Sequence, residues 1–251
     1  MTAIRIRLLG QRDYTDTLDA MRRFTERRDA DTPDEIWLLE HPPVYTLGVR
    51  GARDDLLRVG DIPVVASDRG GLVTYHGPGQ LIAYPLLDLR RLGLNVRQVV
   101  DALEQCVIDV LAQYAIRGER RDGAPGVYVD RRKIASLGLR VKGGCSYHGL
   151  SFNVAMDLAP FAGIHPCGMA GLEVTQLTDL GVQAQTHELV PPLLAALLPA
   201  LGYASAEYAA PDELIFENAS VGWAPPTAMA SNRTETVGGA HPTATEYRAS
   251  S

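Results

Sequence analysis

A stretch rich in glycine and polar side chains, residues 69–84, carries the densest set of groups that could bind a ligand. It reads Arg-Gly-Gly-Leu-Val-Thr-Tyr-His-Gly-Pro-Gly-Gln-Leu-Ile-Ala-Tyr. Its glycines let the backbone approach a bound molecule closely, and its polar side chains supply hydrogen-bond donors and acceptors. The composition alone is equally typical of a tight loop, and we expect such a loop between strands near residues 63–67 and 81–89.

Cys167 has the best setting for a nucleophile among the three cysteines. Pro166 and Gly168 flank it, so the thiol would lie on a stiff, uncrowded turn in a polar loop, where binding residues tend to collect. Cys145 follows two glycines at the start of a strand and is a weaker candidate. Cys106 lies in the apolar stripe of a helix, where a cysteine is usually a small inert hydrophobe.

The chain contains only two lysines, Lys133 and Lys142, among its 24 basic residues. Arginine would serve equally well for bulk charge, but only lysine can lose its proton near neutral pH when its surroundings favour the neutral form. The scarcity of lysine therefore points to a chemical role for one of the two, without choosing between them.

The order of residues in 69–84 resembles the signature of the lipoyl(octanoyl) transferases, a family that loads protein-bound octanoate onto lipoyl domains. Further segments match the family pattern in the same order along the chain. They are Glu-His-Pro-Pro-Val-Tyr-Thr-Leu-Gly from Glu40, Lys-Ile-Ala-Ser-Leu-Gly from Lys133, His-Gly-Leu-Ser-Phe-Asn-Val from His148 and Ile-His-Pro-Cys-Gly from Ile164.

The resemblance implies that Lys133 and Cys167 form the family's catalytic dyad. A thiol attacks as the thiolate, which a neighbouring ammonium favours. Attack on an octanoyl thioester exchanges one thioester for another, so we expect neither a cofactor, such as ATP, nor a metal. The acyl-enzyme would then be attacked by the amine of a lysine on the acceptor, with neutral Lys133 as the base.

The resemblance also implies an acyl pocket built from three segments of the chain. For Arg69 an alternative to lining the pocket is that its side chain only braces the loop. The predicted pocket residues are Arg69, Gly70, Gly71, Leu72, Val73, Thr74, Tyr75, His76, Ser136, Leu137, Gly138, Gly149, Leu150 and Ser151.

The partners that the resemblance implies are octanoyl-acyl carrier protein as donor and lipoyl domains as acceptors. The acceptors would be the lipoyl domains of 2-oxoacid dehydrogenase complexes and the glycine cleavage H protein. Residues 117–142 carry eight basic and three acidic residues in a chain of net charge −6. We expect Arg120, Arg121, Arg131 and Arg132 to recruit these acidic partners, although a solvated pair of strands would explain the same charges. The acidic net charge argues against nucleic acid.

The length of 251 residues and a hydrophobic content of 46% predict one large domain, residues 1–217, followed by a tail. Residues 218–251 are poor in large apolar side chains, so we expect a disordered tail without catalytic function. No signal peptide and no membrane span are recognisable, and three free cysteines suit a reducing compartment. We expect a cytoplasmic protein without a membrane partner.

The fold that the resemblance implies is α/β, a mixed and largely antiparallel sheet with flanking helices, like the catalytic domain of biotin and lipoate ligases. Periodicity predicts strands at residues 3–10 and 146–156 and a hairpin over residues 126–141. It predicts helices at 13–28, 95–114, 175–180 and 186–201.

Two other functions fit parts of the pattern. A lipoate or biotin ligase of the same fold would adenylate a free acid with ATP and magnesium, but it would need no nucleophilic cysteine. A non-catalytic module that binds acyl carriers or lipoyl domains would need neither Lys133 nor Cys167. A requirement for ATP would separate the ligase from the transferase.

Overall fold

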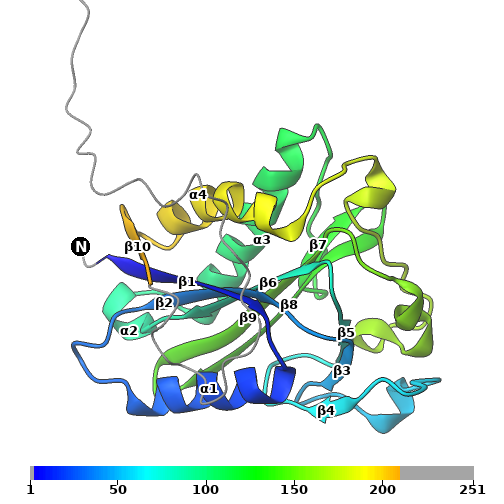
Figure 1. Cartoon of the computed structure of the whole chain (residues 1–251), viewed down its shortest axis with the longest axis horizontal. Coiled ribbons are helices and arrows are strands. Elements are labelled where there is room, and N and C mark those ends of the chain that lie inside the picture. Colours follow the sequence, from blue (N-terminus) through cyan, green and yellow to red (C-terminus); the bar gives the residue numbers. More distant parts are fainter. Residues whose placement is uncertain (1–2, 210–251) are drawn as a thin grey trace, which may run out of the picture.

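The structure is a computed structural model that describes residues 3–209, and within them the chain forms two β-sheets (Figure 1). The larger sheet is mixed, because β1 runs parallel to both of its neighbours and the other neighbouring pairs are antiparallel. This confirms the predicted sheet. Its strands, in order across the sheet, are β10 (Ala206–Tyr208), β1 (Ile4–Gln11), β2 (Glu35–Glu40), β6 (Gln80–Leu86), β9 (Cys145–Asn153), β8 (Arg132–Lys142) and β7 (Gly126–Val129).

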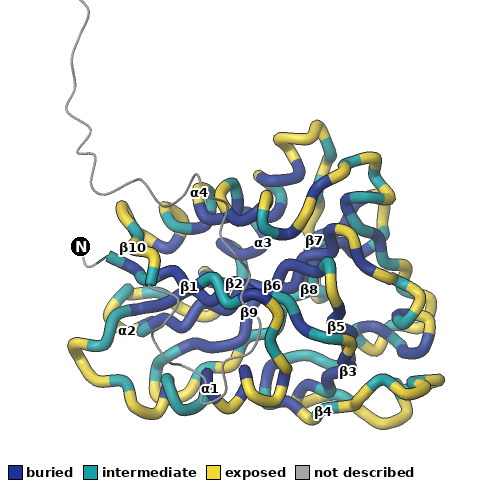
Figure 2. The backbone as a smooth tube through the Cα atoms, viewed as in Figure 1, coloured by how far each residue is buried: buried dark blue, intermediate teal, exposed yellow. Residues whose placement is uncertain are grey.

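Helices cover both faces of the larger sheet. α3 (Val96–Gln113) and α4 (Val190–Ala200) pack on one face, and α1 (Tyr14–Arg27) packs on the other (Figure 1). The predicted start of α3 is confirmed, since the side chains of Asn95 and Gln98 each bond the backbone N–H of the other. Both layers of core therefore meet at the sheet, and the central strands β2 and β6 are buried almost throughout (Figure 2).

A second sheet lies on the same side as α1 (Figure 1), and its strands in order are β4 (Val64–Ala66), β3 (Val44–Leu47) and β5 (Val73–His76). The loop predicted for residues 69–80 is therefore wrong over β5. Its four buried residues pair antiparallel with β3. The glycines act at the ends of this strand instead, as at Gly79, where φ is 81° and a Cβ would lie 2.0 Å from Ala155 O.

The predicted helix at 175–180 is wrong over its first part. Thr175 lies outside any helix, because its N–H donates to Lys133 O, and only Thr178–Leu180 form a short 3₁₀ turn. The strand predicted to end at 156 ends at Asn153. The remaining short elements are α2 (Leu89–Leu92) and the 3₁₀ turns η1 (Arg53–Asp55), η2 (Ala159–Gly163), η3 (Pro166–Gly168), η4 (Thr178–Leu180) and η5 (Thr186–Leu189).

The predicted domain boundary at residue 217 and the predicted tail at 218–251 lie outside the described residues. Within residues 3–209, no helix combines the length and the apolar character needed to cross a membrane.

Candidate active site

Lys133 and Cys167 come together although 34 residues separate them in the sequence. Lys133 Nζ donates a hydrogen bond to Cys167 Sγ at 3.0 Å. The lysine is 2% exposed, and the cysteine is partly exposed. In the described part of the chain no carboxylate forms an ion pair with Lys133, so its charge acts mainly on the sulfur. An ammonium in this position stabilises a thiolate electrostatically.

The backbone of Lys133 is held by the segment that follows Cys167. Lys133 N donates to Glu173 O at 2.8 Å, and Thr175 N donates to Lys133 O at 2.9 Å. Across the hairpin, Lys133 pairs with Tyr128, whose ring centroid lies 5.4 Å from Nζ. The side chain can extend toward Cys167 because Gly126 has no Cβ, which would otherwise lie 2.4 Å from Lys133 Cε.

We therefore expect Gly126→Ala to lower kcat about 100-fold, the typical cost of displacing a catalytic group by about 1 Å. The new methyl group would collide with the lysine and also with Ala135 O at 2.6 Å. Gly123→Ala is the matched control, since Gly123 also has positive φ but a Cβ there would meet no atom within 4 Å. Steady-state kinetics of both variants test this prediction. A wild-type kcat in Gly126→Ala would contradict the role of Gly126 in leaving room for the Lys133 side chain.

Cys167 lies on a turn with unusual backbone geometry. Its φ is 56°, in the left-handed region that non-glycine residues seldom occupy. The following Gly168 has φ 67°, and its N–H donates to His165 O at 2.8 Å. A side chain on Gly168 would press on Leu72, so the turn packs closely against the glycine-rich stretch. Such strained residues concentrate at functional sites.

A cavity extends from Cys167 between the larger sheet and the glycine-rich stretch. It encloses about 450 Å³ of space not filled by protein atoms, part of it open to solvent. Its walls are mainly apolar. The lining residues are Arg69, Gly71, Leu72, Val73, Thr74, His76, Tyr84, Ser136, Leu137, Gly138, His148, Gly149, Leu150, Ser151 and Cys167.

Two predicted pocket residues, Gly70 and Tyr75, do not line this cavity. Gly70 N donates to Leu139 O and so ties the glycine-rich stretch to β8. The ring of Tyr75 packs on Tyr45 and Phe161, away from the cavity. Strand β5 alternates its side chains, so Thr74 and His76 can face the cavity while Tyr75 faces the opposite way. Because the stretch was predicted as a loop, sequence reasoning could not anticipate this alternation.

Arg69 braces the glycine-rich stretch and also lines the cavity. Its guanidinium donates to Thr46 O at 2.7 Å, to Thr46 Oγ1 at 2.8 Å and to Leu72 O at 2.8 Å. Burial lowers the pKa of Arg69, yet a guanidinium stays protonated in proteins. The bracing role is therefore real, and the cation also contributes a positive potential to the cavity.

A chain of buried hydrogen bonds connects the cavity to the backbone of Lys133. His76 Nδ1 donates to Gln80 Oε1 at 2.7 Å, and Gln80 Nε2 donates to Asn153 Oδ1 at 2.9 Å. Asn153 Nδ2 then donates to Thr175 O at 3.0 Å, and Thr175 N bonds Lys133 O. The chain fixes the segment beside Lys133. Sequence reasoning quoted Gln80 and Asn153 within motifs but gave Asn153 no role.

His148 is a wall residue that sequence reasoning left without a function, although it begins a matched motif. Its φ is 59°, and its Nε2 donates to Asp68 Oδ1 at 2.8 Å. Tyr147 OH donates to Asp68 Oδ2 at 2.6 Å. Burial raises the pKa of Asp68, but the hydrogen bonds from His148 and Tyr147 outweigh it and hold that pKa well below its usual value. The ionised Asp68 therefore fixes the His148 ring at the cavity.

Three buried histidines beside the cavity predict a pH-dependent stability. Burial lowers the pKa of His41 to about 4 and also lowers the pKa values of His76 and His148. The unfolded chain takes up these protons near its histidine pKa of ~6.5, whereas the folded chain stays neutral, so stability is full above pH 6.5 and falls as the pH drops below it. For His41, whose folded pKa is about 4, we expect a loss of about 1.4 kcal/mol between pH 8 and pH 5.5, and His76 and His148 add to the loss in the same direction.

Urea unfolding at a series of pH values measures this loss. In His41→Gln the free energy of unfolding should depend less on pH, because the contribution of His41 is removed. In the wild type the neutral His41 ring bonds Arg12 O and Tyr84 OH. A free energy of unfolding that is level from pH 8 to pH 5.5 would contradict the prediction.

No group of three or more His, Cys, Asp and Glu side chains suited to a metal ion occurs in residues 3–209. The groups gathered at the cavity are a thiol, an ammonium, a buried guanidinium and neutral imidazoles. This arrangement can carry out nucleophilic attack by sulfur with proton transfer by an amine.

Comparison with known proteins gives a consistent picture. Residues 13–198 match the model of the lipoyl protein ligase A/B catalytic domain. The octanoyltransferase of Alkalilimnicola ehrlichii is 59% identical over 201 residues, covering 80% of this chain and 94% of that protein. The octanoyltransferase of Dechloromonas aromatica is 58% identical over 196 residues, covering 78% of this chain and 96% of that protein.

Solved structures share the fold at low sequence identity. An archaeal bi-partite lipoate protein ligase from Thermoplasma acidophilum superposes with a TM-score of 0.68 at 13% identity, covering 84% of this chain and 88% of that one. Lipoate-protein ligase A bound with ATP gives a TM-score of 0.69 at 14% identity, covering 83% and 90%. The predicted ligase-like fold is thereby confirmed.

Proposed function

We propose that this chain works through an acyl-enzyme on Cys167. The chain belongs to the lipoyl protein ligase A/B catalytic-domain family and, within it, to the octanoyltransferases. The donor is octanoyl-acyl carrier protein. The acceptor is a lysine of a lipoyl domain, as in 2-oxoacid dehydrogenase complexes and the glycine cleavage H protein. The observation that carries the proposal is the 3.0 Å contact between Lys133 Nζ and Cys167 Sγ at the mouth of a largely apolar cavity.

In the first half-reaction the Cys167 thiolate attacks the carbonyl carbon of the octanoyl thioester. A bond forms between Cys167 Sγ and that carbon, and the bond to the carrier sulfur breaks. The carrier thiolate leaves and takes a proton from the Lys133 ammonium, which becomes a neutral amine. The products are the octanoyl-enzyme and the free carrier thiol, and no energy source is needed because one thioester replaces another.

In the second half-reaction the acceptor lysine arrives as an ammonium. Neutral Lys133 takes one of its protons, and the resulting amine attacks the acyl carbon. The amide forms, the bond to Cys167 Sγ breaks, and a further proton from the amide nitrogen goes to solvent. The enzyme returns to the Cys167 thiolate and Lys133 ammonium with which it began.

The function of a lipoate ligase explains less of the site than that of an octanoyltransferase. Adenylation of a free acid needs no thiol nucleophile, yet the chain places a thiol on a strained turn against a buried lysine. The lipoate ligases resemble this chain at 13–14% identity, which concerns the fold. The relatives at 54–59% identity carry the name octanoyltransferase.

Intact-mass spectrometry after mixing the enzyme with octanoyl-acyl carrier protein, without ATP, tests the proposal. We expect one octanoyl group per chain, located on Cys167 by peptide mapping and discharged when a lipoyl domain is added. An enzyme that stays unmodified until ATP and free octanoate are supplied would favour the ligase instead.

A further inference from the structure

A second groove lies next to the dyad and is lined in part by the segment that follows Cys167. Arg121, Arg131, Asp130 and Glu173 line it together with residues 169–172. Its walls are continuous with the backbone around both catalytic residues, since Arg131 lies two residues before Lys133 and Met169 two residues after Cys167. In addition, Glu173 O accepts the N–H of Lys133. A ligand in this groove would therefore lie alongside the path to the thiol.

The four arginines expected to recruit a partner fall into two pairs. Arg120 is bound to Glu104 at 3.0 Å, and Arg132 lies 4.0 Å from Asp130. For Arg121 and Arg131 no carboxylate lies within ion-pair distance in residues 3–209. These two unpaired arginines are the ones that line the groove. Two of the basic residues in 117–142 that form no ion pair are thus available together, in the groove beside the dyad.

Arg121 is held in position without being neutralised. Its guanidinium lies 4.5 Å from the centroid of the Tyr128 ring, and the Lys133 ammonium lies 5.4 Å from the same centroid. An arginine packed on an aromatic ring loses little freedom when it binds an anion, and its planar fork suits a phosphate. Arg131 is exposed on the tight turn of the hairpin, where Asp130 and Arg131 both have positive φ.

The groove carries side chains of both charges, which limits the classes of ligand that it could bind. Asp130 and Glu173 line it together with the two arginines, so a polyanion would meet repulsion. A molecule with one phosphate and several amide or hydroxyl donors would satisfy both kinds of side chain. The phosphopantetheine arm of a carrier protein has this chemistry, and it brings its thioester at the end of a long flexible chain.

We propose that this groove binds the phosphopantetheine arm of the donor, with the phosphate at Arg121 and Arg131. The proposal rests on the proposed function, because it assumes a thioester donor attached to such an arm. The groove guides the thioester to Cys167 during the first half-reaction only, since the lysine of the acceptor carries no phosphate. Arg121 and Arg131 are thus donor-binding residues rather than general attractants for acidic proteins.

The test compares two small donors, octanoyl-phosphopantetheine and octanoyl-pantetheine, which differ only in the phosphate. Acylation of Cys167 is followed by mass spectrometry at varied donor concentration to give kcat/KM for each. In the wild type we expect the phosphorylated donor to be favoured at least tenfold, the size of one charge-assisted contact. In the double variant Arg121→Gln, Arg131→Gln this ratio should fall toward one.

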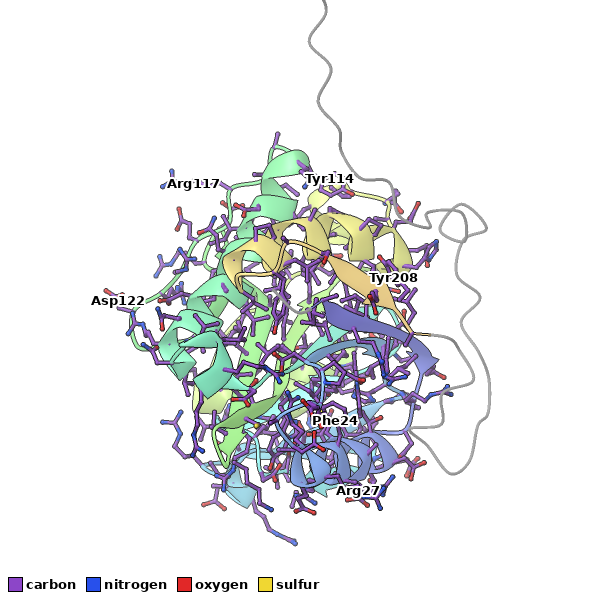
Figure 3. The ribbon with its side chains drawn as sticks, turned by 90° about the vertical axis from the view of Figure 1, so that its left-hand side faces the viewer. Phe24, Arg27, Tyr114, Arg117, Asp122 and Tyr208 are labelled. Carbon is purple, nitrogen blue, oxygen red and sulfur yellow. The ribbon has the colours of Figure 1, made fainter. Side chains whose placement is uncertain are left out.

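The matched control is the double variant Arg97→Gln, Arg117→Gln, which removes the same charge at exposed side chains paired with Asp101 and Glu119. Figure 3 shows Arg117 projecting away from the body of the protein. The control should keep the wild-type ratio, because long-range charge alone does not distinguish a bound phosphate from its absence.

Three results would overturn the proposal. One is equal use of the two small donors by the wild type. Another is a wild-type ratio in Arg121→Gln, Arg131→Gln accompanied by slower reaction with octanoyl-acyl carrier protein, which would assign these arginines to a protein surface. The third is an equal loss of ratio in the control variant. If no thioester donor acylates Cys167 at all, the proposed function itself is wrong, so the two failures are distinguishable.

Discussion

We expect Cys167→Ala to abolish octanoyl transfer, with a fall in kcat of roughly 10⁴–10⁶-fold, as is typical when a catalytic nucleophile is removed. Without Sγ there is no acyl-enzyme, and the acceptor amine would have to attack the donor thioester directly. The side chain is partly exposed and lies on a turn rather than in the core, so the variant should remain folded. Mass spectrometry should then find no octanoyl adduct on the variant after mixing with the donor.

The other two cysteines are the controls for this experiment. Burial raises the pKa of Cys106 far above its usual range and also raises the pKa of the Cys145 thiol. Each is therefore less able than a free thiol to form a thiolate at neutral pH. Cys106→Ala and Cys145→Ala should transfer octanoyl at wild-type rates. An octanoyl adduct on Cys145 or Cys106 in the wild type would overturn the assignment of the nucleophile.

Local context ranked Cys167 first among the cysteines and left two candidate lysines, and the family resemblance then paired Cys167 with Lys133. Cys167 has Pro166 and Gly168 beside it, and Lys133 is one of only two lysines. The main helices were accessible from sequence, since α3 combines a long apolar stripe with a recognisable cap at Asn95. Features of this kind depend on neighbours in the sequence, which is what periodicity and motif order record.

The supports of the pair depend on contacts between distant segments, and sequence reasoning missed them. The segment at 175–180 has the composition of a helix, but Thr175 is bonded to Lys133 and Asn153 instead. Likewise, the sequence of β5 is typical of a loop, and the segment forms a strand because it pairs with β3. Hydrogen bonds between residues so far apart in the sequence override the local preference for a helix or a loop. The same is true of the groove, where only the structure separates paired Arg120 from unpaired Arg121.

Lys133→Arg should separate the two roles given to the lysine. The variant keeps a positive charge beside Cys167, so stabilisation of the thiolate partly survives. It cannot accept a proton, because a guanidinium stays protonated at any working pH. The loss of a general base is typically worth about 10²–10⁴-fold. We therefore expect transfer to the lipoyl domain to fall by this factor, acylation of Cys167 to fall less, and octanoyl-enzyme to accumulate.

Single-turnover measurements of the two half-reactions decide between the roles. Lys142→Arg is the matched control, because Lys142 is exposed and paired with Glu26 at 2.7 Å, and it should react like the wild type. Equal slowing of both half-reactions in Lys133→Arg would assign the lysine to charge or geometry. Wild-type rates in both half-reactions would remove Lys133 from the mechanism.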